Sequence, residues 1–406
     1  MNTMPASRAR RSVPAAVAAV SAAVALGVAA GPAPAARADT AWTVRPAPFT
    51  LGASGLFGVS AAGPDAMLTG GYQWYSYRTS MFCGEIGGPC VPAIHQNPVL
   101  QSRNGGGWSW IGTPGLSGRG QVKFVDAVTA ADGWAAGSRD AADGKGLGTP
   151  YLARSDGQGW TELAVPSALR AVESLDGDAA GAWVSGIPAS DGGASVHRWA
   201  DGGWTPHTLG ASIQGVRQRT PGDVWAVGRT PEAGGAPERG FAARFDGSAW
   251  HTVTPPQAAG KEGRLVAVLP LAADDVWVTG YVMEAGVRVD RSYHWDGSSW
   301  REDALPEGAA FGGGLHHTYS ASLDLWSYRP DGLVEDGAGG LWAVPRPGPA
   351  GTEPRILHYT GGAWRLETTV PGVRGEVRGI TRVPGSTAVW AVGQKDGDAP
   401  LVISAE

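Results

Sequence analysis

Apolar and polar residues alternate in short runs along most of the chain, and Gly, Pro and Asp separate the runs. Such alternation over a few residues, bounded by turn residues, is typical of half-buried β-strands. The clearest unit runs from Gly222 to Pro255. It consists of DVWAVG, a Gly/Pro-rich loop, GFAARF, an Asp-Gly-Ser turn at 246–248, and AWHTVTPP. We expect these segments to form three antiparallel strands.

This unit recurs along the chain with a period near fifty residues. The segments WVSG and HRWADGGW, WVTG and HWDGSSW, and WAVP and HYTGGAW follow the same frame. A run before each Trp-x-x-Gly segment, such as IQGVR at 213–217, adds a first strand, so each unit has four. The tryptophan that opens the fourth strand occurs at Trp42, Trp108, Trp160, Trp204, Trp250, Trp300 and Trp364. Repetition of small sheets at this period predicts a radial or linear array.

Six complete sets of strands can be counted, and the two ends of the chain supply a seventh. The sets span 55–114 (with Met67 in place of the second-strand tryptophan), 122–166, 169–210, 213–255, 264–306 and 332–371. From Val377 the chain provides three strands and stops, whereas 42–48 is a fourth strand without predecessors. Pairing these ends completes a sheet and covers exposed edges. We therefore predict an all-β fold, a seven-bladed β-propeller of four-stranded antiparallel blades, closed by the N-terminal strand.

Residues 1–38 have the features of a secretory signal peptide. Three arginines within 8–11 precede an Ala/Val-rich run over 13–30, and alanines at 36 and 38 suit a signal peptidase. A membrane anchor is the alternative, but the run is mostly alanine and leads into a Pro-rich segment. We expect a secreted, extracellular protein, exported by the general secretory or twin-arginine route, with a single propeller domain over 39–406.

Composition and charge exclude some classes of binding partner. Loss of 1–38 removes four arginines and no acid, so the formal charge changes from -5 to -9. An acidic chain without basic runs argues against nucleic-acid binding. No later segment is apolar enough to span a bilayer, so we expect no membrane insertion after signal cleavage. Glycine (63), proline (30) and a charged fraction of 17% suit many short strands and tight turns. We expect a monomer.

Cysteines and histidines bear on metal chemistry. Cys83 and Cys90 lie close together in a Gly/Pro-rich loop, which predicts a disulfide in an exported protein. Two thiols with only His95 nearby fall short of a four-ligand metal site. His197, His294 and His358 share a third-strand position where other blades have arginine. A residue fixed by the repeat is structural in this interpretation, so we predict no metal site and no cofactor.

The repeated tryptophans have a structural interpretation. Each recurs once per unit, which indicates a wedge between adjacent sheets and not a platform for a ligand. A large aromatic side chain can bury about 150–250 Å² at such a contact.

The frame VWAVG…ARFDGSAWHTV resembles kelch-type repeats and, more loosely, the propeller of galactose oxidase-like secreted proteins. The resemblance covers essentially the whole chain after the leader, although the kelch double glycine is complete only at Gly70-Gly71. The resemblance implies a β-propeller fold. It also brings in copper-radical oxidation as a candidate activity, and that reaction needs Tyr, His and a cysteine cross-linked to tyrosine. Both cysteines are already assigned to the disulfide. The sequence shows no Gly-rich phosphate loop, nucleophile elbow or metal-ligand motif.

Long insertions point to one face of the ring. In each blade the first-to-second and third-to-fourth turns lie on one face (the turn face), and the remaining connections lie on the other (the loop face). The long insertions, 72–97 and 307–331, both belong to the loop face. Ring closure should bring them to neighbouring parts of one rim, and loops on a rigid scaffold usually carry function. The candidate ligand-binding residues there are Tyr72, Trp74, Tyr75, Tyr77, Arg78, His95, His316, His317, Tyr319 and Trp326.

These aromatics favour a binding or interaction module for an extracellular glycan or protein, without catalysis. In the alternative structural interpretation they pack on each other and cap the ring. Two other function classes remain: a carbohydrate-active enzyme on the same rim (galactose oxidase-like oxidase, glycoside hydrolase or lyase), and a structural surface protein. Two carboxylates converging at the ring axis would favour the enzyme, but the spacing pairs none of Glu85, Glu307 and Asp324.

Overall fold

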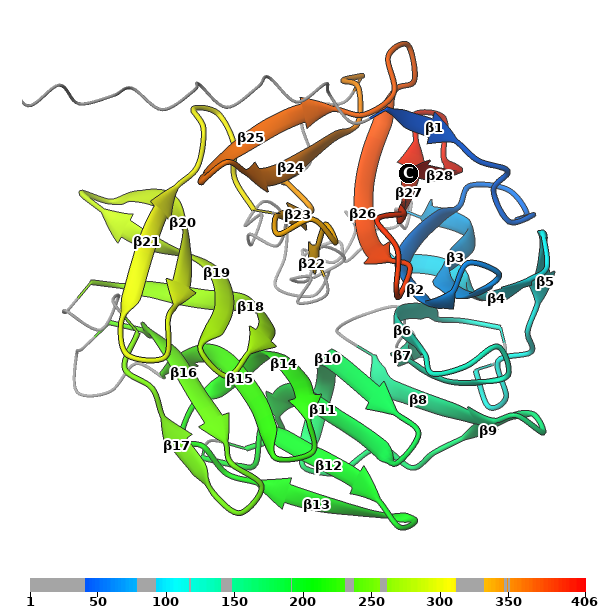
Figure 1. The fold of residues 1–406 in the computed structure, drawn as a ribbon. Helices are drawn as coiled ribbons and strands as arrows, with labels where there is room; N and C mark the ends of the chain where they lie inside the picture. The colour runs from blue at the N-terminus through cyan, green and yellow to red at the C-terminus, as the bar shows by residue number, and fades with distance from the viewer. Residues whose placement is uncertain are drawn as a thin grey trace, which may run out of the picture. The chain divides into compact units, whose positions relative to one another are not determined.

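The computed structural model describes residues 41–78, 93–116, 118–139, 148–190, 192–230, 237–255, 261–311, 332–346, 349 and 351–406. All regular elements within these ranges are β-strands. They form seven antiparallel sheets of four strands each, arranged around a common centre (Figure 1). The predicted seven-bladed β-propeller is confirmed.

The blades follow one another along the chain. Blade 1 contains β2 (Gly55–Gly63), β3 (Ala66–Arg78), β4 (Ala93–Asn104) and β5 (Gly107–Trp110). Blade 2 contains β6 (Gln121–Ala127), β7 (Asp132–Arg139), β8 (Thr149–Asp156) and β9 (Trp160–Glu162). Blade 3 contains β10 (Leu169–Asp178), β11 (Gly181–Pro188), β12 (Val196–Ala200) and β13 (Gly203–His207). Blade 4 contains β14 (Ser212–Thr220), β15 (Asp223–Thr230), β16 (Arg239–Phe245) and β17 (Trp250–Thr252).

The last three blades have the same order. Blade 5 contains β18 (Gly263–Ala272), β19 (Asp275–Glu284), β20 (Val287–Trp295) and β21 (Trp300–Ala304). Blade 6 contains β22 (Leu333–Glu335), β23 (Leu341–Ala343), β24 (Arg355–Thr360) and β25 (Ala363–Thr368). Blade 7 contains β26 (Gly375–Arg382), β27 (Val389–Lys395), β28 (Ala399–Ala405) and β1 (Trp42–Val44).

Blade 7 joins the two ends of the chain. β1 pairs antiparallel with β28, and Trp42 lies opposite Ala405. The backbone N–H of Arg45 continues the pairing by donating to the carbonyl of Val402 at 2.9 Å. β1 is therefore the outermost strand of the sheet that β26, β27 and β28 begin, beside the C-terminus in Figure 1. The predicted closure of the ring is confirmed.

The glycine of each Trp-x-x-Gly segment has a packing reason. β14 bulges between Ile213 and Gly215, and this bulge brings its backbone close to the second strand. A Cβ added to Gly228 would collide with the carbonyl oxygen of Ser212. The equivalent glycines of five other blades face a first-strand carbonyl in the same way: Gly71, Gly137, Gly186, Gly280 and Gly393.

Tryptophans pack between adjacent blades, which confirms their interpretation as wedges. The second-strand Trp183 of blade 3 meets the fourth-strand Trp250 of blade 4, with ring centroids 5.7 Å apart. Trp225 and Trp300 repeat this contact between blades 4 and 5 at 6.3 Å. Between blades 6 and 7, Trp342 meets the N-terminal Trp42 at 5.4 Å.

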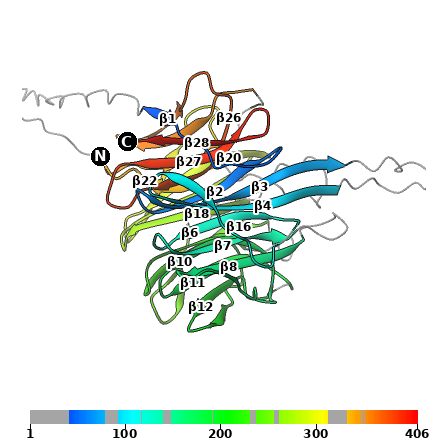
Figure 2. The same ribbon diagram turned by 90° about the vertical axis from the view of Figure 1, so that its right-hand side faces the viewer.

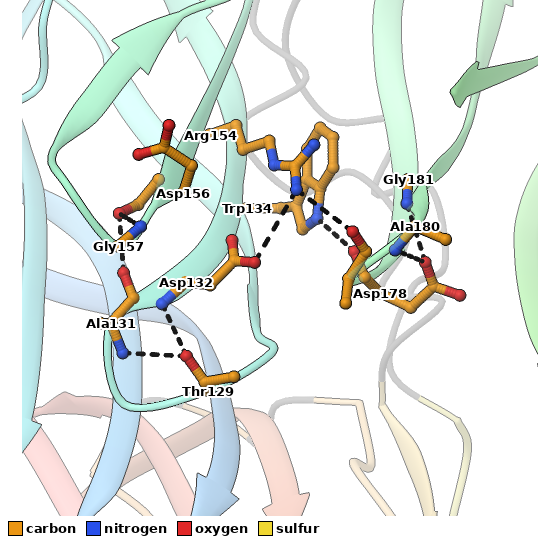
Figure 3. A network of polar contacts seen from close by, with 12 residues as sticks. Thr129, Ala131, Asp132, Trp134, Arg154, Asp156, Gly157, Asp178, Ala180 and Gly181 are labelled. Atoms are coloured by element: carbon orange, nitrogen blue, oxygen red, sulfur yellow. Dashed lines mark hydrogen bonds and ion pairs between the residues drawn. The ribbon is translucent and has the colours of Figure 1, made fainter. Parts of the chain in front are cut away.

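An Arg or His side chain from the third strand stacks on the second-strand tryptophan in five blades. In blade 2 the guanidinium carbon of Arg154 lies 4.7 Å from the centroid of the Trp134 ring, and a carboxylate oxygen of Asp132 lies 3.8 Å from the same guanidinium. Figure 3 shows this arrangement, with the Trp134 indole N–H directed at the carbonyl of Asp178 in blade 3. The five stacked side chains are Arg154, Arg198, Arg244, His294 and His358.

Two predicted repeat positions are wrong by one residue. In blade 3 Arg198 lies opposite Trp183 and stacks on it, so His197 does not share the position of the other two histidines. In blade 1 Leu68 takes the place of the second-strand tryptophan, because Gly71 follows it by three residues, as in the other motifs. Met67 packs instead toward Val383 and Trp390 of blade 7. A shift of one residue turns a strand side chain to the other face of the sheet.

Candidate functional site

The predicted binding residues of the first insertion belong to an elongated hairpin of blade 1. β3 and β4 have 13 and 12 residues. They reach past the neighbouring strands toward the loop face, on the right-hand side of Figure 2. Tyr72, Trp74 and Tyr75 lie on β3, and His95 lies on β4 opposite Ser76, where it is half-buried.

Tyr72 is buried and links blades 1 and 7 through its hydrogen bonds. Its hydroxyl donates to Gln394 Oε1 at 3.3 Å and accepts from Arg378 Nη1 at 3.4 Å. Arg378 is itself buried, and it also donates to Glu376 and Gln394. The Tyr72 ring packs on Phe57, with centroids 5.2 Å apart. These contacts give Tyr72 a structural role at the loop-face end of the junction.

Trp74 is held outward by an unusual backbone. It lies in an irregularity of the β3–β4 pairing between Gln73 and Ser76, with a positive φ of 51°. Its N–H donates to the carbonyl of Leu51 at 2.9 Å. A Cβ on Gly52 would come within 2.8 Å of Trp74 Cδ1, so the indole lies against the backbone there. More than half of its surface, 53%, remains exposed. A strained, fixed and exposed tryptophan is the kind of feature that marks a binding surface.

The side chains of the other predicted residues lie outside the described part of the chain. Tyr77 and Arg78 end β3, and their side chains lie outside the described part of the chain. Cys83, Cys90, His316, His317, Tyr319 and Trp326 also lie outside the described residues. The disulfide, the second insertion and the joint rim stay predictions.

Three exposed apolar side chains lie on or beside the segment that joins blade 7 to blade 1. Val44, Phe49 and Trp110 are here called the seam patch, and with Trp74 and Val287 they are the five large exposed apolar residues in the described ranges. Gln101, directly opposite Trp110 on β4, donates from Nε2 to the carbonyl of Phe49 at 2.7 Å. Residues that lie opposite one another on paired strands point to the same face of the sheet, so Gln101 and Trp110 share a face. The backbone of Phe49 therefore runs along the face that carries Trp110.

The repeat supplies an internal control for this patch. Trp110 follows the wedge Trp108 by two residues on β5. The same position holds Glu162 in blade 2, Pro206 in blade 3, Thr252 in blade 4 and Glu302 in blade 5, all exposed. Blade 6 has the half-buried Leu366 there and blade 7 the exposed Val44, so no other blade has an aromatic residue. The fold therefore has no need of an aromatic ring at this position. Its presence in blade 1, with 45% of its surface exposed, points to contact with something else.

A second candidate site lies on the ring axis. The seven first strands enclose a cavity of about 220 Å³. Its charged side chains are Asp126, Asp176 and Arg217, from blades 2, 3 and 4, whereas blade 5 contributes Leu269 and Pro270. Two carboxylates thus do converge at the axis, as the enzyme hypothesis requires.

Hydrogen bonds to the chain occupy both of these carboxylates. Asp126 accepts from Ser60 Oγ at 3.1 Å and from the Gly177 N–H at 2.8 Å. Asp176 accepts from Arg217 Nη1 at 3.0 Å and from the backbone N–H of the next blade. Every one of these partners belongs to a neighbouring blade, so the two carboxylates clamp blades 1 to 4 together. This geometry gives them a structural role and assigns no catalytic step.

The clamp places negative charges close together. Burial, and then the neighbouring Asp176 carboxylate, raise the pKa of Asp126 to about 7. Burial likewise raises the pKa of Asp176, and Arg217 opposes this effect. Asp126 therefore keeps its proton at mildly acidic pH and loses it near neutrality.

Metal binding and membrane insertion are two further classes of function. Within the described ranges, no group of three or more His, Cys, Asp or Glu side chains is arranged to hold a metal ion. The part of the chain that the structure describes contains no helix long and apolar enough to cross a membrane.

The sequence interpretation missed the axial carboxylates and the seam patch for different reasons. Asp126 and Asp176 face one another only after the first strands of different blades are aligned, a step that depends on the bulges. Trp110 does carry a sequence signal, since comparison of the fourth strands shows tryptophan where no other blade has an aromatic residue. Phe49 has no comparable signal, because the connections between blades differ in length.

Comparison with known proteins supports the fold alone. No protein-family model matches the sequence, and no curated protein matches it either. The β-propeller domain of the Trilobed protease from Pyrococcus furiosus, described as having an open velcro topology, is similar over 87% of this chain and 93% of its own, at 8% identity and a TM-score of 0.51. YCF48 bound to a D1 peptide matches over 90% of this chain and 96% of its own, at 14% identity and a TM-score of 0.49. YCF48 from Cyanidioschyzon merolae covers 90% of this chain and 99% of its own, at 14% identity and a TM-score of 0.47. The propeller of the protease thus agrees with the seven-bladed ring, whereas the kelch-like type stays a prediction.

Proposed function

We propose that this protein is a secreted, non-catalytic binding module that recruits an extracellular protein through the seam patch. Secretion rests on the signal-like residues 1–38, and the relation to kelch-type repeats rests on the VWAVG…DGSAW frame. The observation that carries the binding role is Trp110, an exposed aromatic at a position where no other blade has an aromatic residue.

The chemistry of the patch favours a protein over a glycan. Phe49 and Trp110 offer apolar rings, and such residues anchor protein interfaces. Sugar recognition also needs free polar side chains around the ring. Here Gln101 donates to the Phe49 carbonyl, and Gln73 Oε1 accepts from the Leu51 N–H at 3.0 Å, so both amides are used by the chain itself.

A glycan is the second candidate partner, and Trp74 is the observation that favours it. Its indole is exposed on the loop face and fixed against Gly52, as a stacking platform for a sugar ring would be. The enzyme alternative has less support, because chain contacts occupy the axial carboxylates.

Site-specific photo-cross-linking tests the proposal. p-Benzoylphenylalanine at position 110 is exposed to the secreted proteins of the source organism, and the same probe at position 287 is the matched control. Both positions are exposed and apolar, but only the first belongs to the seam patch. We expect a defined cross-linked protein from position 110 that position 287 does not give.

The affinity of that partner then identifies the contact. We expect the Phe49→Ser/Trp110→Glu variant to bind at least about tenfold more weakly, because truncation of interface aromatics commonly costs more than 1 kcal/mol. Val287→Ser should bind like the unmodified protein. Equal affinity of the unmodified protein, the double variant and Val287→Ser would reject the seam patch as the binding site. A glycan array that shows binding lost in Trp74→Ala but kept in the double variant would favour the glycan instead.

A further inference from the structure

The interface between blades 1 and 2 departs from the pattern of the others. At the second-strand position, six blades have a tryptophan and blade 1 has Leu68. At the third-strand position opposite, five blades have Arg or His and blade 1 has Ser102. Blade 7 also has a serine there, Ser404, but Arg45 Nε donates to it at 2.7 Å and its guanidinium lies 5.9 Å from the Trp390 ring. Blade 1 alone among the seven lacks both members of the stack.

A cavity of about 270 Å³ lies at this interface on the turn face. Leu68 and Ser102 line it from blade 1, and Trp160 lines it from blade 2. Trp160 is the fourth-strand wedge, which in the equivalent position of blade 4 packs on a second-strand tryptophan. The cavity therefore lies where the fold elsewhere places an indole and an Arg or His side chain.

We propose that this cavity, here called the blade 1–2 slot, binds a neutral aromatic ring carrying a polar substituent, stacked against Trp160 in the manner of the missing tryptophan. The repeat itself shows that an indole fits beside this wedge. Cavities formed where a large side chain is absent bind rings of matching size, as an engineered cavity of about 150 Å³ binds benzene. The slot is larger than that, so it has room for a two-ring aromatic.

The rim of the slot accounts for the polar substituent. Asn104 and Gln158 bring exposed amides to the rim, and Ser102 brings a hydroxyl. Two other hydroxyls are used by the chain: Thr129 Oγ1 accepts from the Asp132 N–H at 2.9 Å, and Ser155 Oγ donates to the Ala131 carbonyl at 2.7 Å. The one carboxylate in the lining, Asp132, faces Arg154 (Figure 3). Asp132 is the only charged residue of the lining and is paired with an arginine outside it, and this favours a neutral ligand.

Thermal unfolding with defined probes tests the slot. Indole represents a free aromatic compound, N-acetyl-tryptophanamide represents a tryptophan side chain on a polypeptide, and methyl α-glucoside represents a neutral sugar. We expect indole or N-acetyl-tryptophanamide to raise the unfolding midpoint in a concentration-dependent way, since a ligand that binds only the folded state stabilises it. The probe that raises the midpoint more identifies the natural source of the ring, because indole represents a free compound and N-acetyl-tryptophanamide a polypeptide.

Filling the slot provides the decisive variant. Leu68→Trp restores the side chain of the other blades, so it should raise the midpoint without ligand and remove the response to both aromatic probes. Ser102→Arg closes the same space from the third strand and serves if the tryptophan variant does not fold. Val287→Trp adds an indole at an exposed position elsewhere and should keep the full response.

Three outcomes would overturn the assignment. They are an unchanged aromatic response in both slot-filling variants, no response to either aromatic in the unmodified protein, and protection by methyl α-glucoside alone. Because the slot lies between blades 1 and 2 and the seam patch between blades 7 and 1, failure of either proposal leaves the other standing.

Discussion

Blades 4 and 1 have the same four-stranded architecture and differ at their surfaces. In blade 4 the second strand carries Trp225, Arg244 stacks on it, and the fourth strand exposes Thr252. In blade 1 the equivalent residues are Leu68, Ser102 and Trp110. Blade 4 buries its aromatic ring between blades, whereas blade 1 has lost that ring and exposes another. In a repeat protein, residues shared by the blades hold the ring together, and departures from the repeat mark surfaces with another use.

The largest expected effect is a difference between the two blades in the free energy of unfolding lost when the second-strand side chain is truncated. Trp225 is fully buried, so Trp225→Ala should reduce the free energy of unfolding by about 3–5 kcal/mol. Leu68→Ala should cost only about 2 kcal/mol, because Leu68 already borders a cavity. Urea denaturation of both variants measures the difference. Equal losses would mean that blade 1 is packed like blade 4 and that its departures have no structural meaning.

The axial clamp predicts an unusual dependence of stability on pH. Asp126 has a pKa of about 7 in the folded protein against 3.8 for an ordinary aspartate, so between these values the folded state binds more protons than the unfolded state. Stability should therefore fall as pH rises through this window. We expect the unfolding midpoint to drop by several degrees between pH 4.5 and pH 7.5.

Asp126→Asn isolates this contribution. The amide keeps an oxygen that can accept from the Gly177 N–H and carries no charge beside Asp176. The unfolding midpoint of the variant should fall much less between pH 4.5 and pH 7.5 than that of the unmodified protein. At pH 7.5 the variant should be the more stable of the two. An identical pH profile in the two proteins would show that Asp126 is not the group responsible.

The sequence predicts the scaffold well because the scaffold repeats. Seven copies of one pattern fix the strands, the wedges and the closure by Trp42, since an error in one copy is corrected by the others. The two wrong positions, Met67 in place of Leu68 and His197 in place of Arg198, differ from the correct ones by one residue, and one residue of register decides which face of the blade a side chain joins. The axial carboxylates and the slot depend on contacts between blades, which no single repeat contains.

An exchange of one residue between two blades tests the account most directly. Trp110→Glu gives blade 1 the residue of blade 5, and Glu302→Trp does the reverse. Both sites are exposed, so we predict that each variant keeps its free energy of unfolding within about 1 kcal/mol. Only Trp110→Glu should lose affinity for the partner that cross-links at position 110. Unfolding of Trp110→Glu at markedly lower urea, or undiminished affinity in that variant, would contradict the account.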